Sequence, residues 1–514
     1  MTTRHRVEYQ RDRSGHRNRC IRNLLLSAGI VAACSCTPGV PVTGRSDDDP
    51  TLRGSQAETA STRALAHETP ILVVTYNDAT PDGKVIFTQT GRTVFPGASL
   101  LGWSFSNDGG ATWKYGGKIK PPTEFGIAAL WGDPAIVTAK YSPNLVYISA
   151  LAADSQIVPP GGRSGDMATS GACIARSTNG GINFSIFQCF SANRDFYDGA
   201  SLATAGAPGD HRIFAAYTDT NLRHIDVWQS DDGLTPFHKI ADPFPGKSVS
   251  GHPRMAYDDQ TGALIIAAIA FNPAAGDSRI YMNRLVANQW QTPKLVSQPI
   301  SGISIPVGTQ RVRTASAFSF DVGNPSRKKP ENSANMASLL PVPDGIRLLY
   351  TTRDSATLRF YVRGTACARD LSACADEPQW GTTPGNFSNT PGHQWNPTVR
   401  ASPSVAGAQA VWKATYQTTD DQSDRVSIKQ GTLIRSAFGV AEFLPLPLMT
   451  PRIVCPDLRN GGGYWGDYDE SANAGVDRNG AQLFLLAFSD SSRGCVSQKS
   501  FSSTHLHVRA VQFK

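Results

Sequence analysis

Beyond about residue 70 the chain alternates short apolar runs with polar turns, and no stretch shows the apolar spacing of a long helix. Runs such as ILVVTYND (71–78), IFAAYTD (213–219) and ALIIAAIAF (263–271) have the length of strands. Asp, Gly and Pro separate them, and the whole chain holds 47 Gly and 34 Pro. This pattern predicts an all-β protein with many short strands.

The apolar runs fall into repeated units, each with a polar cluster, a strand, a turn with Asp and Gly, and a second strand. Seven units follow one another at roughly 50–80 residues, a period typical of propellers and solenoids. They are residues 71–78, 131–151, 197–219, 251–271, 335–354, 395–416 and 464–490. Because every unit contains strands, we expect a β-propeller of seven blades, or of six if the weak fifth unit is an insertion.

The N-terminus has the features of an export signal. Seven Arg precede the ten-residue apolar run LLLSAGIVAA (24–33), which is too short to span a bilayer. Val31-Ala32-Ala33-Cys34 resembles a bacterial lipobox, in which Cys34 is acylated; the alternative is an ordinary signal peptide cleaved nearby. We therefore predict a signal peptide over 1–33, a flexible tether over 34–69 and the propeller over 70–514.

Charge and cysteines follow from that division. Cleavage before Cys34 lowers the basic residues from 49 to 42 and the acidic residues from 42 to 40, so a formal charge of +7 becomes +2. A nucleic-acid partner is not expected without a concentrated basic surface. The later cysteines form three neighbouring pairs, which favours local disulfides in an oxidising compartment: Cys173 with Cys189, Cys367 with Cys374, and Cys455 with Cys495.

The segment SFSNDGGATWKY (104–115) predicts a hairpin fastened by its own side chains, because Ser and Asp bond nearby amides and Gly permits positive φ. The pattern Ser106, Asp108, Gly110, Thr112, Trp113 matches the Asp-box, and Ser177, Asn179 and Gly181 repeat it. A decayed copy is SDDGLTPF (230–237). The chain therefore resembles the sialidase and Asp-box-repeat superfamily, which implies a sialidase-like propeller with these residues in structural roles, away from the pocket.

In a propeller the starts of the first strands and the ends of the second strands lie on one face. The first strands are expected to bring polar residues to the channel mouth there: Asp133, Asp198, His252, Asn335, Asn396 and Asp467. The alternative is that these groups cap strand ends and hold water. The two longest loops, 153–172 and 297–332, are expected on the same face, the latter with Arg311 and Arg313.

Sialidases, as the resemblance implies, bind a carboxylate with three Arg and use a Tyr nucleophile, a Glu and an acid/base Asp. The candidates for these roles are Tyr468, Glu470, Asp133, Arg254, Arg353 and Arg400. The chain departs from the family signature at HETPILVV, where no Arg-Ile-Pro occurs.

Three functions remain open at this point. The first is an exported, envelope-associated glycan hydrolase of exo-sialidase type, and the second is a non-catalytic propeller that binds a glycan or an extracellular protein. The third is a scaffold in which Asp133, Asp198 and Asp467 hold Ca²⁺, since oxygen ligands suit that ion; no other cofactor is expected. We expect a monomer that touches the membrane only through a lipid on Cys34.

Overall fold

The structure of the chain is a computed structural model. It describes residues 40–42, 56–78, 85–88, 91–94, 97–122, 127–154, 171–191, 197–206, 209–300, 303–307, 310–314, 318–323, 345–353, 358–377, 392–401, 412–419, 425–435, 441–443, 446–447, 452–453, 463–464, 471–476, 482–490 and 507–513. These all belong to the unit Cys36–Lys514. Among them, no helix has the length and hydropathy needed to cross a membrane.

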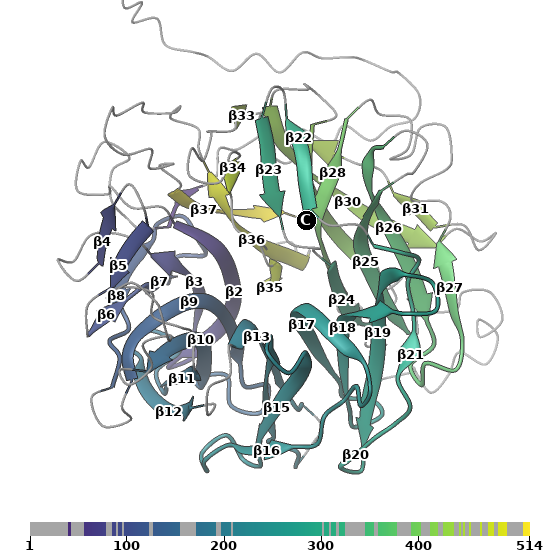
Figure 1. Cartoon of the computed structure of the whole chain (residues 1–514). Helices are drawn as coiled ribbons and strands as arrows, with labels where there is room; N and C mark the ends of the chain where they lie inside the picture. Colours follow the sequence, from purple (N-terminus) through teal and green to yellow (C-terminus); the bar gives the residue numbers. More distant parts are fainter. Residues whose placement is uncertain are drawn as a thin grey trace, which may run out of the picture. The chain divides into compact units, whose positions relative to one another are not determined.

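Six antiparallel blades each come from one stretch of chain (Figure 1). The first three are β2 (Gln56–Ala66), β3 (Thr69–Asp78), β7 (Leu101–Ser106) and β8 (Lys114–Lys118); β9 (Ile127–Thr138), β10 (Val146–Asp154), β11 (Gly171–Ser177) and β12 (Ser185–Ser191); β13 (Tyr197–Thr204), β14 (Ile213–Asp219), β15 (His224–Ser230) and β16 (His238–Ile240). The next three are β17 (Ser248–Asp258), β18 (Ala263–Asn272), β19 (Asp277–Val286) and β20 (Gln289–Trp290); β24 (Phe318–Val322), β25 (Ile346–Arg353), β26 (Phe360–Cys367) and β27 (Cys374–Glu377); β28 (Gln394–Ala401), β29 (Trp412–Thr418), β30 (Arg425–Arg435) and β31 (Ala441–Phe443).

A further sheet, which we call the closing sheet, joins the two ends of this unit. It consists of β35 (Ser471–Val476), β36 (Gln482–Asp490), β37 (His507–Phe513) and β1 (Val40–Pro41). The inner strands contact one another in the order β2, β9, β13, β17, β24, β28, β35 and back to β2, so the ring is closed. The propeller prediction is confirmed, with six single-stretch blades and a closing sheet that completes the ring.

Short strands decorate the blades. They are β4 (Val85–Thr88), β5 (Gly91–Val94), β6 (Ala98–Ser99), β21 (Lys294–Leu295), β22 (Ile303–Val307), β23 (Gln310–Thr314), β32 (Leu446–Pro447), β33 (Arg452–Ile453) and β34 (Gly463–Tyr464). Strand β23 pairs in parallel with β34, which ties the chain before β24 to the chain before β35.

The hydrophobic core lies between neighbouring sheets. Trp103 and Ile148, for example, pack between the first and second blades, and Phe214 and Ile266 pack between the third and fourth. Every residue of β14 is buried, because both faces of a middle strand are covered. This double burial explains why the second strands appear in the sequence as unbroken apolar runs rather than alternating ones.

Two boundaries differ from the sequence prediction. Residues 56–66, expected in the tether, form β2, the inner strand of the first blade. This strand lacks an apolar run because it is built from small residues: Ala60, Ala64 and Ala66 are buried beside the buried hydroxyls of Thr59 and Ser61. The expected loop 297–332 contains β22, β23 and the inner strand β24, whereas Asn335 lies outside the described residues.

The hairpin turn at Ser106 lies between β7 and β8, and similar turns follow β11 and β15. Ser106 Oγ accepts from the Gly110 amide at 2.8 Å, and Asp108 Oδ1 accepts from the Thr112 amide at 2.9 Å. Burial opposes ionisation of Asp108, but its hydrogen bonds with Thr112, Ser106 and Ala111 together lower its pKa to about 2. Trp113 is buried against the closing sheet.

Two of the predicted disulfides, Cys173–Cys189 and Cys367–Cys374, are confirmed. Each joins directly paired residues of the two outer strands of a blade. Such bonds indicate folding in an oxidising environment. Cys455 and Cys495 lie outside the described residues.

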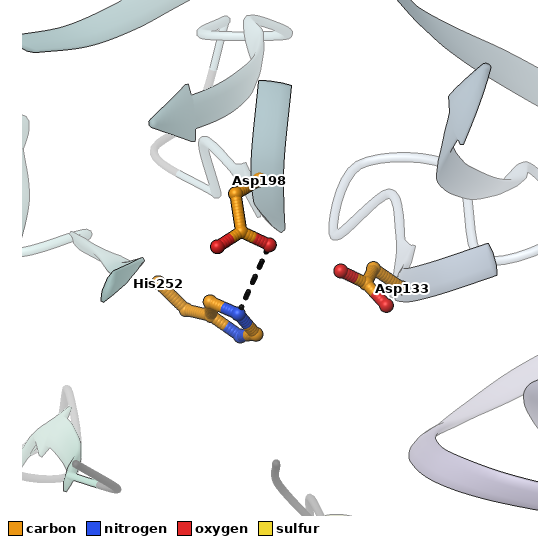
Figure 2. Close-up of side chains that lie close together, drawn as sticks. All are labelled: Asp133, Asp198 and His252. Carbon is orange, nitrogen blue, oxygen red and sulfur yellow. Dashed lines mark ion pairs between the residues drawn. The ribbon is translucent and has the colours of Figure 1, made fainter. Parts of the chain in front are cut away.

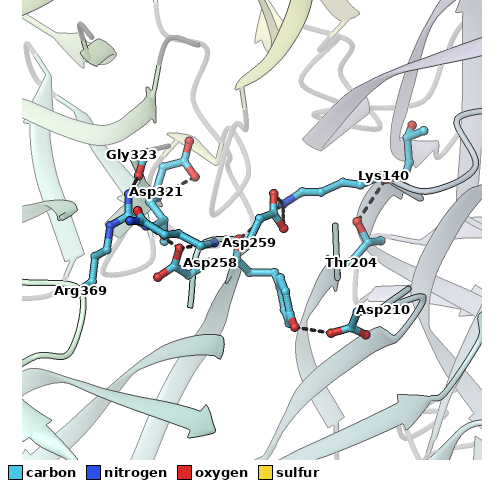
Figure 3. Close-up of polar contacts among 12 residues, drawn as sticks. Lys140, Thr204, Asp210, Asp258, Asp259, Asp321, Gly323 and Arg369 are labelled. Carbon is cyan, nitrogen blue, oxygen red and sulfur yellow. Dashed lines mark hydrogen bonds and ion pairs between the residues drawn. The ribbon is translucent and has the colours of Figure 1, made fainter. Parts of the chain in front are cut away.

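Polar contacts fasten the blades at the C-terminal ends of the inner strands (Figure 3). Lys140 Nζ lies 3.0 Å from Asp259 Oδ2, which links the chain after β9 to the chain after β17 across the third blade. Arg369 bonds both Asp258 and the carbonyl of Gly323, so the fourth and fifth blades are tied together. These contacts occupy the C-terminal ends of the inner strands, and the site described next lies at their N-terminal ends.

Candidate functional site

Each of five inner strands has a β-bulge near its N-terminal end. The pairing of β2, β9, β13, β17 and β28 with the next strand shifts there. Positive φ angles accompany the shifts, at Glu58 (53°), Asp133 (51°), Gly199 (56°), Gly251 (76°) and Asn396 (49°). Bulges re-aim side chains beside active sites, and left-handed backbone at non-glycine residues costs about 1–3 kcal/mol each. Their repetition at one level indicates a built site.

Three side chains from neighbouring inner strands meet at this level (Figure 2). Asp133 of β9, Asp198 of β13 and His252 of β17 each offer an atom within 4.8 Å of the others, and we call them the mouth cluster. His252 Nε2 lies 3.4 Å from Asp198 Oδ1. The sequence predicts these residues at the channel mouth, and the structure brings them together.

The electrostatics of the mouth cluster favour one ionised carboxylate. Burial raises the pKa of Asp198, but hydrogen bonds from His252 and Asp133 outweigh it, so that the pKa lies below its ordinary value. His252 is buried, while 44% of the Asp198 side chain is exposed. A ligand in the channel therefore has access to the carboxylate, and the imidazole holds it in place.

Close packing fixes the backbone of the mouth cluster. A Cβ added to Gly199 would lie 2.4 Å from Cγ of His252, so only glycine lets the ring lie against β13. Asn77 accepts a hydrogen bond from the amide of Asp133 at 2.8 Å and donates to Glu58. Glu58 was missed from the sequence because it lies in the segment predicted to be a tether.

A cavity of about 540 Å³ lies along the inner strands behind this level. Its charged lining residues are Arg63, Lys140, Arg254, Asp321 and Arg400, and Asn396 lines it at the level of the bulges. Arg254 follows His252 by two residues, or about 7 Å of extended chain. Lys140 is paired with Asp259, so among the described lining residues three arginines face one anion, Asp321, and the cavity favours a negatively charged ligand.

The predicted arginines divide in the structure. Arg254 and Arg400 line the central cavity, and Arg400 donates to the carbonyls of Ser471 and Val399. Arg353 does not line it: this exposed residue ends β25, its guanidinium 5.7 Å from the ring centroid of Phe360. Arg63 lines the cavity instead, and it was not among the predicted residues because β2 was not predicted.

Several predicted residues lie outside the described part of the chain. They are Cys34, Asp467, Tyr468 and Glu470. Their roles stay predictions.

Comparison with known proteins assigns no family. No family model matches the chain, and no curated protein matches it. An exo-β-1,3-galactanase from Phanerochaete chrysosporium has 7% identity over 80% of this chain and 93% of that chain, with a TM-score of 0.35. Aleuria aurantia lectin, a six-bladed propeller that recognises fucose, has 11% identity over 77% of this chain and 97% of that chain, with a TM-score of 0.36. A family 117 glycoside hydrolase from Zobellia galactanivorans has 16% identity over 51% of this chain and 76% of that chain, with a TM-score of 0.30. Similarity this weak carries no argument about function.

Proposed function

We propose that this protein is a glycan-directed propeller that hydrolyses a glycosidic bond at the mouth cluster. The observation that carries this proposal is the meeting of two carboxyl groups and an imidazole at the level of the bulges, on a strand that also carries Arg254 of the cationic cavity. Glycosidases use two carboxyl groups, and in retaining enzymes these lie about 5–5.5 Å apart. At the mouth cluster an oxygen of Asp133 lies within 4.8 Å of one of Asp198, and the two carboxyl groups share a hydrogen bond, so both can reach the same bond of a substrate.

The two carboxyl groups would divide the work through one shared proton. Like charges in contact disfavour double ionisation, so one group of such a pair keeps a proton. Because His252 helps to keep Asp198 ionised, the proton falls to Asp133. Asp133 then protonates the leaving oxygen as general acid, and Asp198 acts as the base or nucleophile.

The cavity favours an acidic sugar as the substrate. Arg63, Arg254 and Arg400 offer guanidinium groups, which bind carboxylates more specifically than ammonium groups do. A sialoside is the acidic glycan that the sequence resemblance suggests. In that case Tyr468 and Glu470, which precede β35 in the sequence, would supply the nucleophile, and Asp133 would remain the acid.

The test is hydrolysis of fluorogenic glycosides, sialoside beside neutral galactoside and fucoside, by the full chain. We expect turnover of the sialoside, a loss of 10²–10⁴-fold in Asp133→Asn, and a raised KM for the sialoside alone in Arg63→Gln. Asp231→Asn, at an exposed carboxylate in the third hairpin turn, is the matched control. Loss of turnover in Tyr468→Phe identifies the sialidase nucleophile, and full turnover there assigns that role to Asp198.

A non-catalytic glycan-binding propeller is the second candidate. The observation that favours it is a set of exposed apolar side chains at the ends of second strands or in the turns that follow them, namely Leu222, Phe271 and Leu358. Phe271 is 46% exposed, and an exposed ring at a channel mouth can stack on a sugar. Glycan-array binding without turnover of any glycoside, by protein with a cooperative melt, would replace the hydrolase by this function.

A further inference from the structure

A second group of two carboxylates and an imidazole lies on the second and third strands of the third blade. Asp219 ends β14, and His224 and Asp226 lie on β15 after a short turn; we call these three the turn cluster. Each offers a ligand atom within 4.8 Å of the others. We propose that the turn cluster binds a divalent transition metal of the Zn²⁺ class.

Asp219 carries the strongest evidence for a ligand. Its Oδ1 accepts hydrogen bonds from the amides of Asn221 and Leu222 at 3.0 and 2.9 Å, which shape the turn. Its Oδ2 is buried and has no hydrogen-bond partner among the described residues, and Asp219 as a whole is 0% exposed. A buried carboxylate oxygen without a partner is costly, and a metal ion would satisfy it.

Asp226 of the turn cluster already forms an ion pair with Lys239. Its Oδ1 lies 2.7 Å from both His224 Nε2 and Lys239 Nζ. The Lys239 side chain is 50% exposed, so its ammonium group can move into water when another cation binds. The two carboxylates carry two negative charges and Lys239 supplies one positive charge, so the cluster can accept a further cation.

The donor set decides the class of metal. One imidazole nitrogen and two carboxylates suit Zn²⁺ better than Ca²⁺, which takes six to eight oxygens. Ligand atoms around a tetrahedral Zn²⁺ lie about 3.4 Å apart, so a small closure of the three side chains would complete the site. The fourth position would hold water.

The metal would also brace the mouth cluster. Tyr197 donates its hydroxyl to Asp226 Oδ2 at 2.7 Å, and Tyr197 directly precedes Asp198. The proposal does not rest on glycan hydrolysis, because its test measures the metal alone.

The test is calorimetric titration of the metal-free full chain with Zn²⁺, Mn²⁺ and Ca²⁺ in turn. We expect one Zn²⁺ per chain, and affinity at least tenfold lower in Asp219→Asn and His224→Gln. Asp219→Asn retains the oxygen that shapes the turn, so it should fold. Lys239→Gln removes the competing ammonium and should tighten binding several-fold, whereas His238→Gln, at an exposed histidine nearby, should leave it unchanged.

Three results would overturn the proposal. They are no Zn²⁺ binding by folded wild-type protein, equal binding by wild type and Asp219→Asn, and a loss of binding in Asp198→Asn but not in Asp219→Asn. The last result would move the metal to the mouth cluster. A preference for Ca²⁺ over Zn²⁺ would refute the class of metal.

Discussion

Gly199 shows at the scale of one residue how the backbone serves the site. Its φ of 56° and the His252 ring against it leave no room for a side chain. We predict that Gly199→Ala lowers the free energy of unfolding by roughly 1–3 kcal/mol and displaces His252. Gly209→Ala is the control, because Gly209 has a φ of 80° but no described residue lies within 4 Å of an added Cβ. Denaturant melts of both variants measure the difference, and equal losses would show that the ring contact contributes nothing.

Asp108 gives a pH prediction for the first hairpin turn. Because its pKa is lowered to about 2, its hydrogen bonds stabilise the fold fully above the ordinary value of 3.8, and that stability is lost as the pH falls toward 2. The group is almost fully exposed, so solvent screens the effect. We expect Asp108→Asn to lower the melting temperature at pH 7 and to match wild type near pH 2. A difference that is the same at both pH values would contradict this role.

At the scale of elements, the disulfides stabilise the outer strands of two blades. The chain-entropy relation gives about 3 kcal/mol for the Cys173–Cys189 bond and about 2 kcal/mol for the shorter loop of Cys367–Cys374. Their sequence separations are 16 and 7 residues. We expect the double Ser variant of the first pair to melt at the lower temperature of the two. The reverse order in calorimetric scans would mean that packing, not loop length, decides.

The strands differ in how clearly the sequence predicts them. Middle strands such as β14 and β18 have both faces covered and appear as apolar runs. The inner strand β2 is built from small and polar residues and therefore resembled a tether. The inner strand β24 has only five residues, FSFDV, and was missed inside a long polar segment. The residues of the mouth cluster were predicted because a clear apolar second strand follows each of their inner strands. Glu58 and Arg63 were missed because their own strand, β2, was not recognised. No local pattern marks a residue whose role depends on strands that are distant in the sequence.

For the whole molecule, the N-terminal segment decides whether the ring closes. Strand β2 pairs with β3 and contacts both β9 and β35. A chain that starts at residue 70 would lack β2 and expose an unpaired edge of β3, and we expect it to aggregate without a cooperative melt. A chain that starts at residue 36 retains β1 and β2 and should melt like the full chain. Circular dichroism melts compare the two truncated chains. A cooperative melt of the chain that starts at residue 70 would show that β2 is not needed to close the ring.

Chemistry at the mouth cluster is tested most directly by one measurement. It is the turnover and binding of the glycoside that the full chain hydrolyses fastest, measured for wild type and Asp133→Asn, because Asp133 is the general acid whichever group is the nucleophile. We predict a loss of 10²–10⁴-fold in kcat with the Kd for the glycoside changed little. An unchanged kcat in the variant would place the chemistry away from Asp133 and so away from the mouth cluster.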